Sequence, residues 1–251
     1  MTRALDNLDE IRAAIDVLEH PFYRRWSAGE LSAAELACYA GEYEHAVVAL
    51  ADASEQAAAC AQGGHDACEL QCHAAEERAH VELWRQFAHA AGAPGHAGET
   101  LPPLAQTRAC VRAWTAGESL LEHLAVLYAI EAGQPDVSAT KLEGLAAHYG
   151  YAPEGPAVEY FALHSHRDVE HARQARALIT QLLDGAHDED AQARRMTARA
   201  RAALRGNWLL LDGVQEHARR LGGCLSAFVS ATPAAAAGRR GDRRDHASGQ
   251  R

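Results

Sequence analysis

Long apolar runs, strand patterns and lysine are all scarce in this sequence of 251 residues. A helix needs about 18 consecutive apolar residues to cross a membrane, and because no run approaches that length we expect no membrane partner. The N-terminus, MTRALDNLDE, lacks the apolar core of a secretory signal, so we expect a cytoplasmic protein. β-Branched residues are few and no useful alternating pattern appears, which argues against a β-sheet fold.

Cysteine usage and charge exclude two further classes of protein. The six cysteines are scattered over a long chain, unlike the dense framework of a small disulfide-rich domain. The formal net charge is -10. Since phosphate binding requires clustered cations, we do not expect a nucleic acid as a partner of this acidic chain.

Alanine, leucine, glutamate and arginine dominate the composition, which favours helix. Ser32 and Glu35 form a capping-box pattern, whereas Pro21 and Pro135 are expected to interrupt the chain. We expect helices over residues 5–18, 32–61, 66–91, 104–131 (bent at Gly117), 138–148, 155–183 and 188–220. The predicted fold class is all-α, a seven-helix antiparallel bundle in one domain over residues 1–230, with a disordered basic tail over 231–251.

The segment FALHSHRDVEHARQA carries the strongest chemical signal. His164, Asp168 and His171 stand at i, i+4 and i+7, and therefore fall within about 60° of one another on one face of a helix. Two imidazoles and a carboxylate on one stripe are suitable ligands for a divalent transition metal. The competing interpretation is a solvated polar face, because the residues between them are also polar.

Two other segments offer similar ligands. Glu76 or Glu77 shares a helical face with His80, and His73 lies one further turn back; a plain surface pair is the alternative. Glu131 ends the apolar stretch 124–130, so we expect it to be buried and to require a cation or strong hydrogen bonds. An arginine partner is the alternative there.

Together these segments give six candidate ligands, which are Glu76 (or Glu77), His80, Glu131, His164, Asp168 and His171. Three carboxylates and three imidazoles on three helices suit two iron or manganese ions. Zinc is less suitable because it prefers four ligands and fewer carboxylates.

Lys141 is the only lysine in the chain, and every other basic side chain apart from histidine is an arginine. Its retention suggests a task that a guanidinium cannot perform, such as acting as an amine nucleophile or proton donor. Chance survival in an arginine-biased sequence is the alternative.

The segments HPFYRRWSAGELS, EERAHVELWRQFA, YAIEAGQPDVSATKLEGL and EYFALHSHRDVEHA together resemble the haem-oxygenase-like di-iron oxidases. The likeness is greatest to the CADD-like branch, which is related to the TenA and PqqC proteins. The resemblance implies a haem-oxygenase-like helical bundle that holds two iron ions (Fe/Fe or Mn/Fe) and consumes O2 with an external reductant. It also implies a homodimer.

CADD-like enzymes are 4-aminobenzoate synthases that consume their own side chains. The resemblance therefore implies that Tyr23 supplies the ring and Lys141 the amino group. It matches His80, Glu131, His164, Asp168 and His171 to metal ligands. Only two residues separate the Glu76–Glu77 pair from His80, fewer than in the CADD-like pattern. We favour Glu76 as the ligand, and the choice between the two glutamates stays open.

Three alternatives remain at this stage. A di-iron oxygenase could act on a free amino acid or amine, by N-oxygenation or C–C cleavage. The second alternative is a metal-free PqqC-like oxidase or a TenA-type thiaminase. A thiaminase needs a cysteine nucleophile, and Cys110 is the candidate. An interaction protein that docks a basic partner is the third.

Overall fold

The structure is a computed structural model that describes residues 2–61, 63–94 and 102–230. The chain divides into two compact units, residues 1–218 and 219–251, and all candidate site residues belong to the first. The disordered tail expected over residues 231–251 lies outside the described residues. A single domain over residues 1–230 stays a prediction.

The described residues form nine α-helices and one short 3-10 helix and contain no strand, which confirms the all-α fold class. Within this part of the chain, no helix combines the length and the hydropathy that a membrane span requires. In chain order the elements are α1 (Thr2–Ala14), η1 (Val17–Glu19), α2 (Pro21–Ser27), α3 (Ala33–Cys60), α4 (Gly64–Ala90), α5 (Ala105–Trp114), α6 (Leu120–Glu131), α7 (Gln134–His148), α8 (Glu159–Asp184) and α9 (Glu189–Ser230).

The helix count exceeds the expected seven for two reasons. Pro21 begins the short helix α2 instead of only interrupting the chain, and the side chain of His20 caps that helix by accepting from the Phe22 N–H at 3.0 Å. The segment 104–131 is two helices, α5 and α6, instead of one bent helix. Pro135 likewise sits in the first turn of α7. A proline is tolerated in the first turn because the N–H that it lacks has no partner there.

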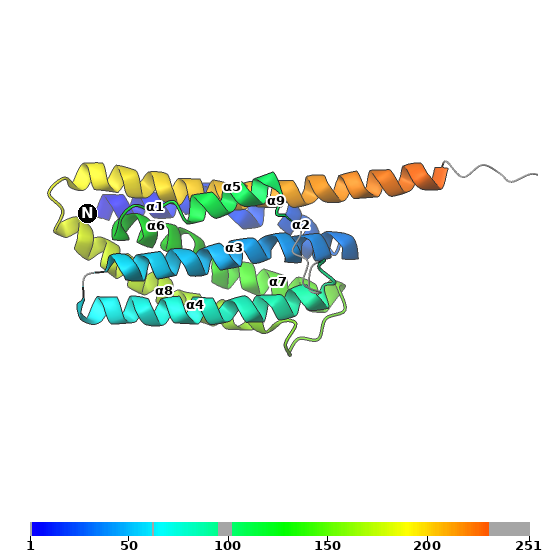
Figure 1. The fold of residues 1–251 in the computed structure, drawn as a ribbon, viewed down its shortest axis with the longest axis horizontal. Coiled ribbons are helices and arrows are strands. Elements are labelled where there is room, and N and C mark those ends of the chain that lie inside the picture. Colours follow the sequence, from blue (N-terminus) through cyan, green and yellow to red (C-terminus); the bar gives the residue numbers. More distant parts are fainter. Residues whose placement is uncertain (1, 62, 95–101, 231–251) are drawn as a thin grey trace, which may run out of the picture. The chain divides into compact units, whose positions relative to one another are not determined.

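Helices α4, α6 and α8 bring the candidate ligands to one place. Helix α3 runs beside α4, and α8 packs against α4, α6 and α7 (Figure 1). The capping box predicted at the start of α3 is confirmed, with Ser32 and Glu35 each bonding the other's backbone N–H. Helix α6 is buried from residue 121 to residue 131, so the carboxylate of Glu131 at its end lies inside the bundle.

Candidate metal centre and lysine chamber

Two groups of histidine and carboxylate side chains lie inside the bundle, where the ligand atoms of each group are within 4.8 Å of one another. The first group is His73, Glu77, Glu131 and His171, and the second is Glu77, His80 and His164. All of these side chains are buried, and Glu77 belongs to both groups. We call these six residues together with Asp168 the acid–imidazole cluster. A carboxylate shared by two groups is the arrangement that bridges two metal ions.

Glu77 occupies the interior position that the sequence analysis favoured for Glu76. Glu77 is 1% exposed, and one of its oxygens lies 3.1 Å from His80 Nδ1. Glu76 is absent from both groups found in the described part of the chain. The Glu76 side chain is 34% exposed and forms an ion pair with Arg167 at 2.5 Å. The structure therefore favours Glu77, because the rotation of α4 turns Glu76 toward solvent.

Glu76 nevertheless contacts the cluster from outside through His171. Its Oε2 lies 3.2 Å from His171 Nε2, while His171 Nδ1 faces inward, 3.8 Å from Glu77 and 3.9 Å from Asp168. An outer carboxylate that accepts the far N–H of a ligating histidine fixes the ring and leaves the inner nitrogen free. Glu76 is thus suited to orient His171.

His164 is oriented in the same manner by the backbone. Its Nδ1 lies 2.7 Å from the carbonyl oxygen of Tyr160, one turn earlier on α8. Because a carbonyl only accepts, Nδ1 carries the proton and Nε2 presents its lone pair to the interior. The Tyr160 ring stacks on the imidazole, with centroids 3.9 Å apart, and holds its plane.

The interior atoms of the cluster fit a metal centre because many have no hydrogen bond. Within the described part of the chain, this holds for His164 Nε2, His171 Nδ1, one oxygen each of Glu77 and Glu131, and both oxygens of Asp168. Buried polar groups are nearly always hydrogen-bonded, so several unpaired acceptors in one place indicate bound cations. Carboxylate and imidazole donors suit iron and manganese. The individual ligand assignments stay predictions.

Asp168 is part of the cluster, but it belongs to neither the first nor the second group found among the described residues. Burial, followed by the charges of Glu131 and Glu77, raises the pKa of Asp168 to about 10, against the opposing charge of Lys141. Without cations, its carboxyl is therefore protonated at neutral pH. A bound cation would reverse this, since it favours the carboxylate.

The imidazoles of the first group differ in protonation. Burial lowers the pKa of His73, but the charge and hydrogen bond of Glu131, 2.9 Å away, raise it to about 9. Burial and the neighbouring His73 lower the pKa of His171, whose ring lies 4.0 Å from that of His73. In the metal-free chain, His73 therefore carries the positive charge that balances Glu131.

Lys141 lies beside the cluster in a closed aromatic space that we call the lysine chamber. Five rings surround its Nζ, with centroids 5.0 to 5.8 Å away, and these rings are Tyr23, Tyr39, Tyr43, Trp84 and Phe161. The side chain is 0% exposed, and Nζ has no hydrogen-bond partner among the described residues. Burial lowers the pKa of Lys141 to about 7, although the charge of Asp168 opposes the shift.

Close packing of α2 on α7 places Tyr23 in this chamber. A Cβ on Gly144 would lie 2.4 Å from Trp26 Nε1, so only glycine lets the indole approach. Trp26 Nε1 then donates to the Lys141 carbonyl at 3.3 Å. The Tyr23 hydroxyl lies 3.1 Å from that of Tyr39. Burial raises the pKa of Tyr23, so the phenol is neutral.

The chamber and the cluster share a wall made of aromatic residues. The Tyr160 ring stacks on His164 of the cluster and lies 4.9 Å from Trp84 of the chamber. Asp168 acts electrostatically on Lys141 across the same boundary. A reaction begun at the cluster would therefore reach Tyr23 and Lys141 without crossing solvent.

His73 belongs to the cluster although it is not among the six ligands expected from the sequence. The signal was present, because three residues of α4 repeat the spacing i, i+4 and i+7 found on α8: His73, Glu77 and His80. Applying that pattern to both helices would have added His73 to the candidates beside Glu77, although it would not have excluded Glu76.

Comparisons with known proteins agree with this site. A family described as iron-containing redox enzymes matches residues 72–206, a segment that contains the whole acid–imidazole cluster and Lys141. A 4-aminobenzoate synthase from Chlamydia muridarum is 35% identical over 206 residues, which are 76% of this chain and 84% of that protein. The likeness of sequence thus extends well beyond the cluster.

Solved structures support the fold. A TenA homologue from Pseudomonas syringae superimposes with a TM-score of 0.71 at 16% identity, over 86% of this chain and 92% of that chain. A CADD-like protein of unknown function from Nostoc punctiforme gives a TM-score of 0.66 at 19% identity, over 86% of this chain and 99% of that chain. These likenesses confirm the haem-oxygenase-like fold.

Proposed function

Because the chain belongs to the family of iron-containing redox enzymes, we propose that it is an O2-dependent di-iron oxidase that makes 4-aminobenzoate from its own side chains. Tyr23 supplies the ring and Lys141 supplies the nitrogen. The lysine chamber carries this proposal: the Nζ of the only lysine lies 5.7 Å from the centroid of the Tyr23 ring, in a closed space beside the cluster. The name of the chlamydial relative supports the product.

The acid–imidazole cluster would hold two metal ions, as Fe/Fe or Mn/Fe, and Glu77 belongs to both groups of candidate ligands. These ions would supply the reduction of O2, with electrons from an external reductant. Glu76 and the Tyr160 carbonyl hold the rings of His171 and His164 toward that position. A homodimer and the absence of a nucleic-acid partner stay predictions.

The chamber residues prepare the two reacting side chains. With a pKa of about 7, Lys141 has a large neutral fraction at physiological pH, and a neutral amine is the nucleophile. The Tyr39 hydroxyl holds the phenol of Tyr23 in place, and the aromatic walls exclude water. The overall change would consume two O2, two electrons from the external reductant and two protons, and would release two water molecules. The Cα–Cβ bond of Tyr23 breaks and leaves glycine at residue 23, while Cβ is oxidised to the carboxylate carbon. The Cε–Nζ bond of Lys141 breaks and leaves an aldehyde at Cε, and the lysine nitrogen replaces the phenol oxygen on the ring.

Isotope labelling tests this proposal, because a single lysine makes the label specific to one site. The protein is produced with lysine labelled by ¹⁵N at Nζ and tyrosine labelled by ¹³C in the ring, then exposed to iron, reductant and O2. We expect aminobenzoate that carries both labels, in at most one equivalent per chain, and a peptide containing residue 23 that has lost the side-chain mass. Mass spectrometry measures both.

Matched variants complete the experiment. Tyr23→Phe and Lys141→Arg are expected to reduce the product to background, whereas Tyr151→Phe, a tyrosine outside the chamber, is expected to leave it unchanged. Unlabelled aminobenzoate, or turnover of an added amine by both chamber variants, would instead support an oxygenase that acts on a free substrate.

Cys110 does not favour a thiaminase, because burial raises the pKa of its thiol and so disfavours the thiolate.

A further inference from the structure

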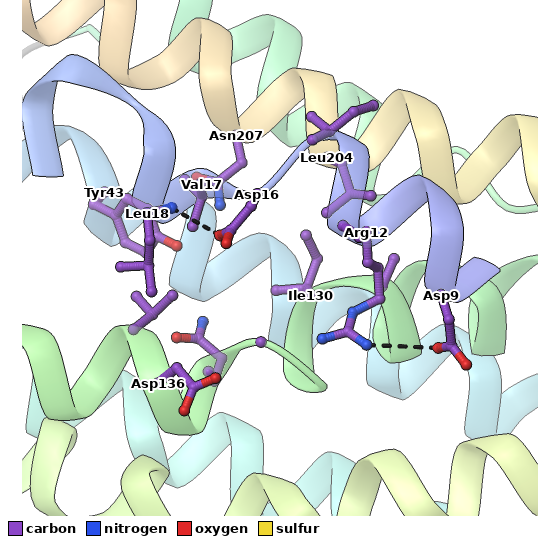
Figure 2. Close-up of a pocket in the computed structure, with 16 residues that line it drawn as sticks. Asp9, Arg12, Asp16, Val17, Leu18, Tyr43, Ile130, Asp136, Leu204 and Asn207 are labelled. Carbon is purple, nitrogen blue, oxygen red and sulfur yellow. Dashed lines mark hydrogen bonds and ion pairs between the residues drawn. The ribbon is translucent and has the colours of Figure 1, made fainter.

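A cavity of about 210 Å³ is lined in part by Tyr43, one of the rings around Lys141. Its walls come from α1, η1, α3, α6, α7 and α9, and Figure 2 shows the side chains that line it. Tyr43 belongs to both spaces, since its ring centroid is 5.0 Å from Lys141 Nζ and it also lines the cavity. The lysine chamber and the cavity therefore meet at Tyr43.

The end of the cavity at Tyr43 offers unused hydrogen-bond acceptors. The side-chain amides of Asn207 and Gln134 hydrogen-bond to the Tyr43 hydroxyl. Their oxygens, Asn207 Oδ1 and Gln134 Oε1, are buried with no hydrogen-bond partner in the part of the chain that the structure describes. The two residues are only 6% and 4% exposed. Buried acceptors of this kind favour a ligand that brings N–H donors.

A cation lines another part of the cavity. The Arg12 guanidinium lies beside Ile130 on the cavity side, with Asp9 beyond it at 3.6 Å (Figure 2). Asp9 is shared with Arg176, which it contacts at 2.7 Å, so Arg12 is not fully neutralised by its partner. A guanidinium is the side chain best suited to bind a carboxylate.

Other walls of the cavity are apolar. Val17, Leu18, Ile130 and Leu204 line it, and such walls favour a flat hydrocarbon ring. Sites for drug-sized ligands begin at about 300 Å³, so a cavity of about 210 Å³ suits a smaller molecule. Asp16 and Asp136 also line the cavity, and they would repel a carboxylate placed anywhere except at Arg12.

We propose that this cavity binds a flat molecule with an amino group at one end and a carboxylate at the other, which is the chemistry of 4-aminobenzoate. The amino group donates to Gln134 and Asn207 beside Tyr43, and the carboxylate binds Arg12. This inference rests on the proposed function, because it makes the cavity the place that receives the product after it leaves the lysine chamber.

Titration of the full-length, metal-loaded Tyr23→Phe protein with 4-aminobenzoate tests the inference by calorimetry, since this variant makes no product of its own. We expect saturable binding of one molecule per chain, and binding of benzoate or aniline weaker by about tenfold or more, because each lacks one polar end. Arg12→Gln in the same background is expected to weaken binding about tenfold or more, whereas Arg173→Gln, at the exposed surface, leaves it unchanged.

Crystals soaked with 4-aminobenzoate give a second measurement that does not depend on how well a variant folds. Density for the ring in the cavity, with its carboxylate at Arg12, supports the inference. Three results would each overturn the inference. These are the absence of saturable binding, binding of benzoate and aniline as tight as that of 4-aminobenzoate, and preferred binding of a free amino acid such as tyrosine. Binding needs no turnover, so failure to bind while labelled aminobenzoate is still formed refutes the cavity assignment alone. Binding without labelled product refutes the proposed function alone.

Discussion

Helices α4 and α8 carry the same spacing of two imidazoles and a carboxylate, yet their carboxylates are in opposite electrostatic situations. Burial would raise the pKa of Glu77, but the hydrogen bond with His80 and the neighbouring imidazoles of His164 and His73 lower it to about 2. Burial and two carboxylates raise the pKa of Asp168 on α8 to about 10. The spacing therefore places three side chains on one face of each helix, while the neighbours of each carboxylate determine whether it is charged.

This difference predicts two roles in binding cations. Glu77 is already a carboxylate between the two groups and can accept a cation without losing a proton. Asp168 must release a proton when the cations arrive, so binding at its side of the cluster is coupled to pH. The following predictions test whether α4 and α8 differ in this way.

Replacing Glu77 is expected to have the largest effect. Glu77→Gln removes the carboxylate shared by both groups, so metal content measured by mass spectrometry should fall from about two ions per chain to well under one. Glu76→Gln is the matched control on the neighbouring residue. It retains an acceptor for His171 Nε2 and should keep both ions. The reverse result, with Glu76 essential and Glu77 dispensable, would restore the preference of the sequence analysis.

Replacing His73 should affect one of the two positions. His73 belongs to the first group only, so His73→Ala is expected to retain about one ion per chain and to lose the magnetic coupling between two iron ions, as measured by Mössbauer spectroscopy. His166→Gln, on the exposed face of α8, is the control. Two coupled ions in the His73 variant would show that this imidazole is not a ligand.

The elements that the sequence predicted well are those set by local chemistry. The capping box of Ser32 and Glu35 fixes the start of α3 through bonds between neighbours, and the structure contains it. The stripe of His164, Asp168 and His171 needs only helical geometry. Pro21 misled the prediction because proline ends one helix and begins another equally well.

The choice between Glu76 and Glu77 could not be made from the sequence in the same way. Adjacent residues on a helix point about 100° apart, so only the rotation of α4 against α6 and α8 decides which one is interior. That rotation depends on packing between distant segments. The lysine chamber is a similar case, because its rings come from α2, α3, α4 and α8 and meet only in the folded chain.

Asp168 is expected to make the stability of the metal-free protein depend on pH. Its pKa is about 10 in the folded state, whereas an aspartate in the unfolded chain has a pKa of about 3.8. The folded state therefore holds a proton that the unfolded chain releases, and the resulting stability is present below pH 3.8 and is lost as the pH rises toward 10. Linkage limits this loss to about 1.4 kcal/mol per pH unit.

Asp168→Asn keeps the shape of the protonated carboxyl and cannot titrate. The difference in unfolding free energy between variant and wild type, measured with urea in the presence of a chelator, should move in favour of the variant from pH 5 to pH 8. The corresponding difference for Glu77→Gln should not change with pH over this range, because the lowered pKa of Glu77 places its titration below pH 5. A constant difference across that range would mean that Asp168 is ionised in the metal-free protein, and the contrast between α4 and α8 would not hold.

The smallest effect is expected outside the cluster, at the ion pair of Arg167 and Glu76. The two side chains are 47% and 34% exposed, so water screens their attraction, and such surface pairs contribute about 0.5 kcal/mol or less. Arg167→Gln should therefore leave both the unfolding free energy and the metal content nearly unchanged, because Glu76 still contacts His171 at 3.2 Å. Loss of an ion from this variant would mean that Glu76 needs Arg167 to hold His171 in place. In that case the orientation of the α8 imidazole would depend on a surface pair, whereas His80 on α4 lies against the buried Glu77 of its own helix.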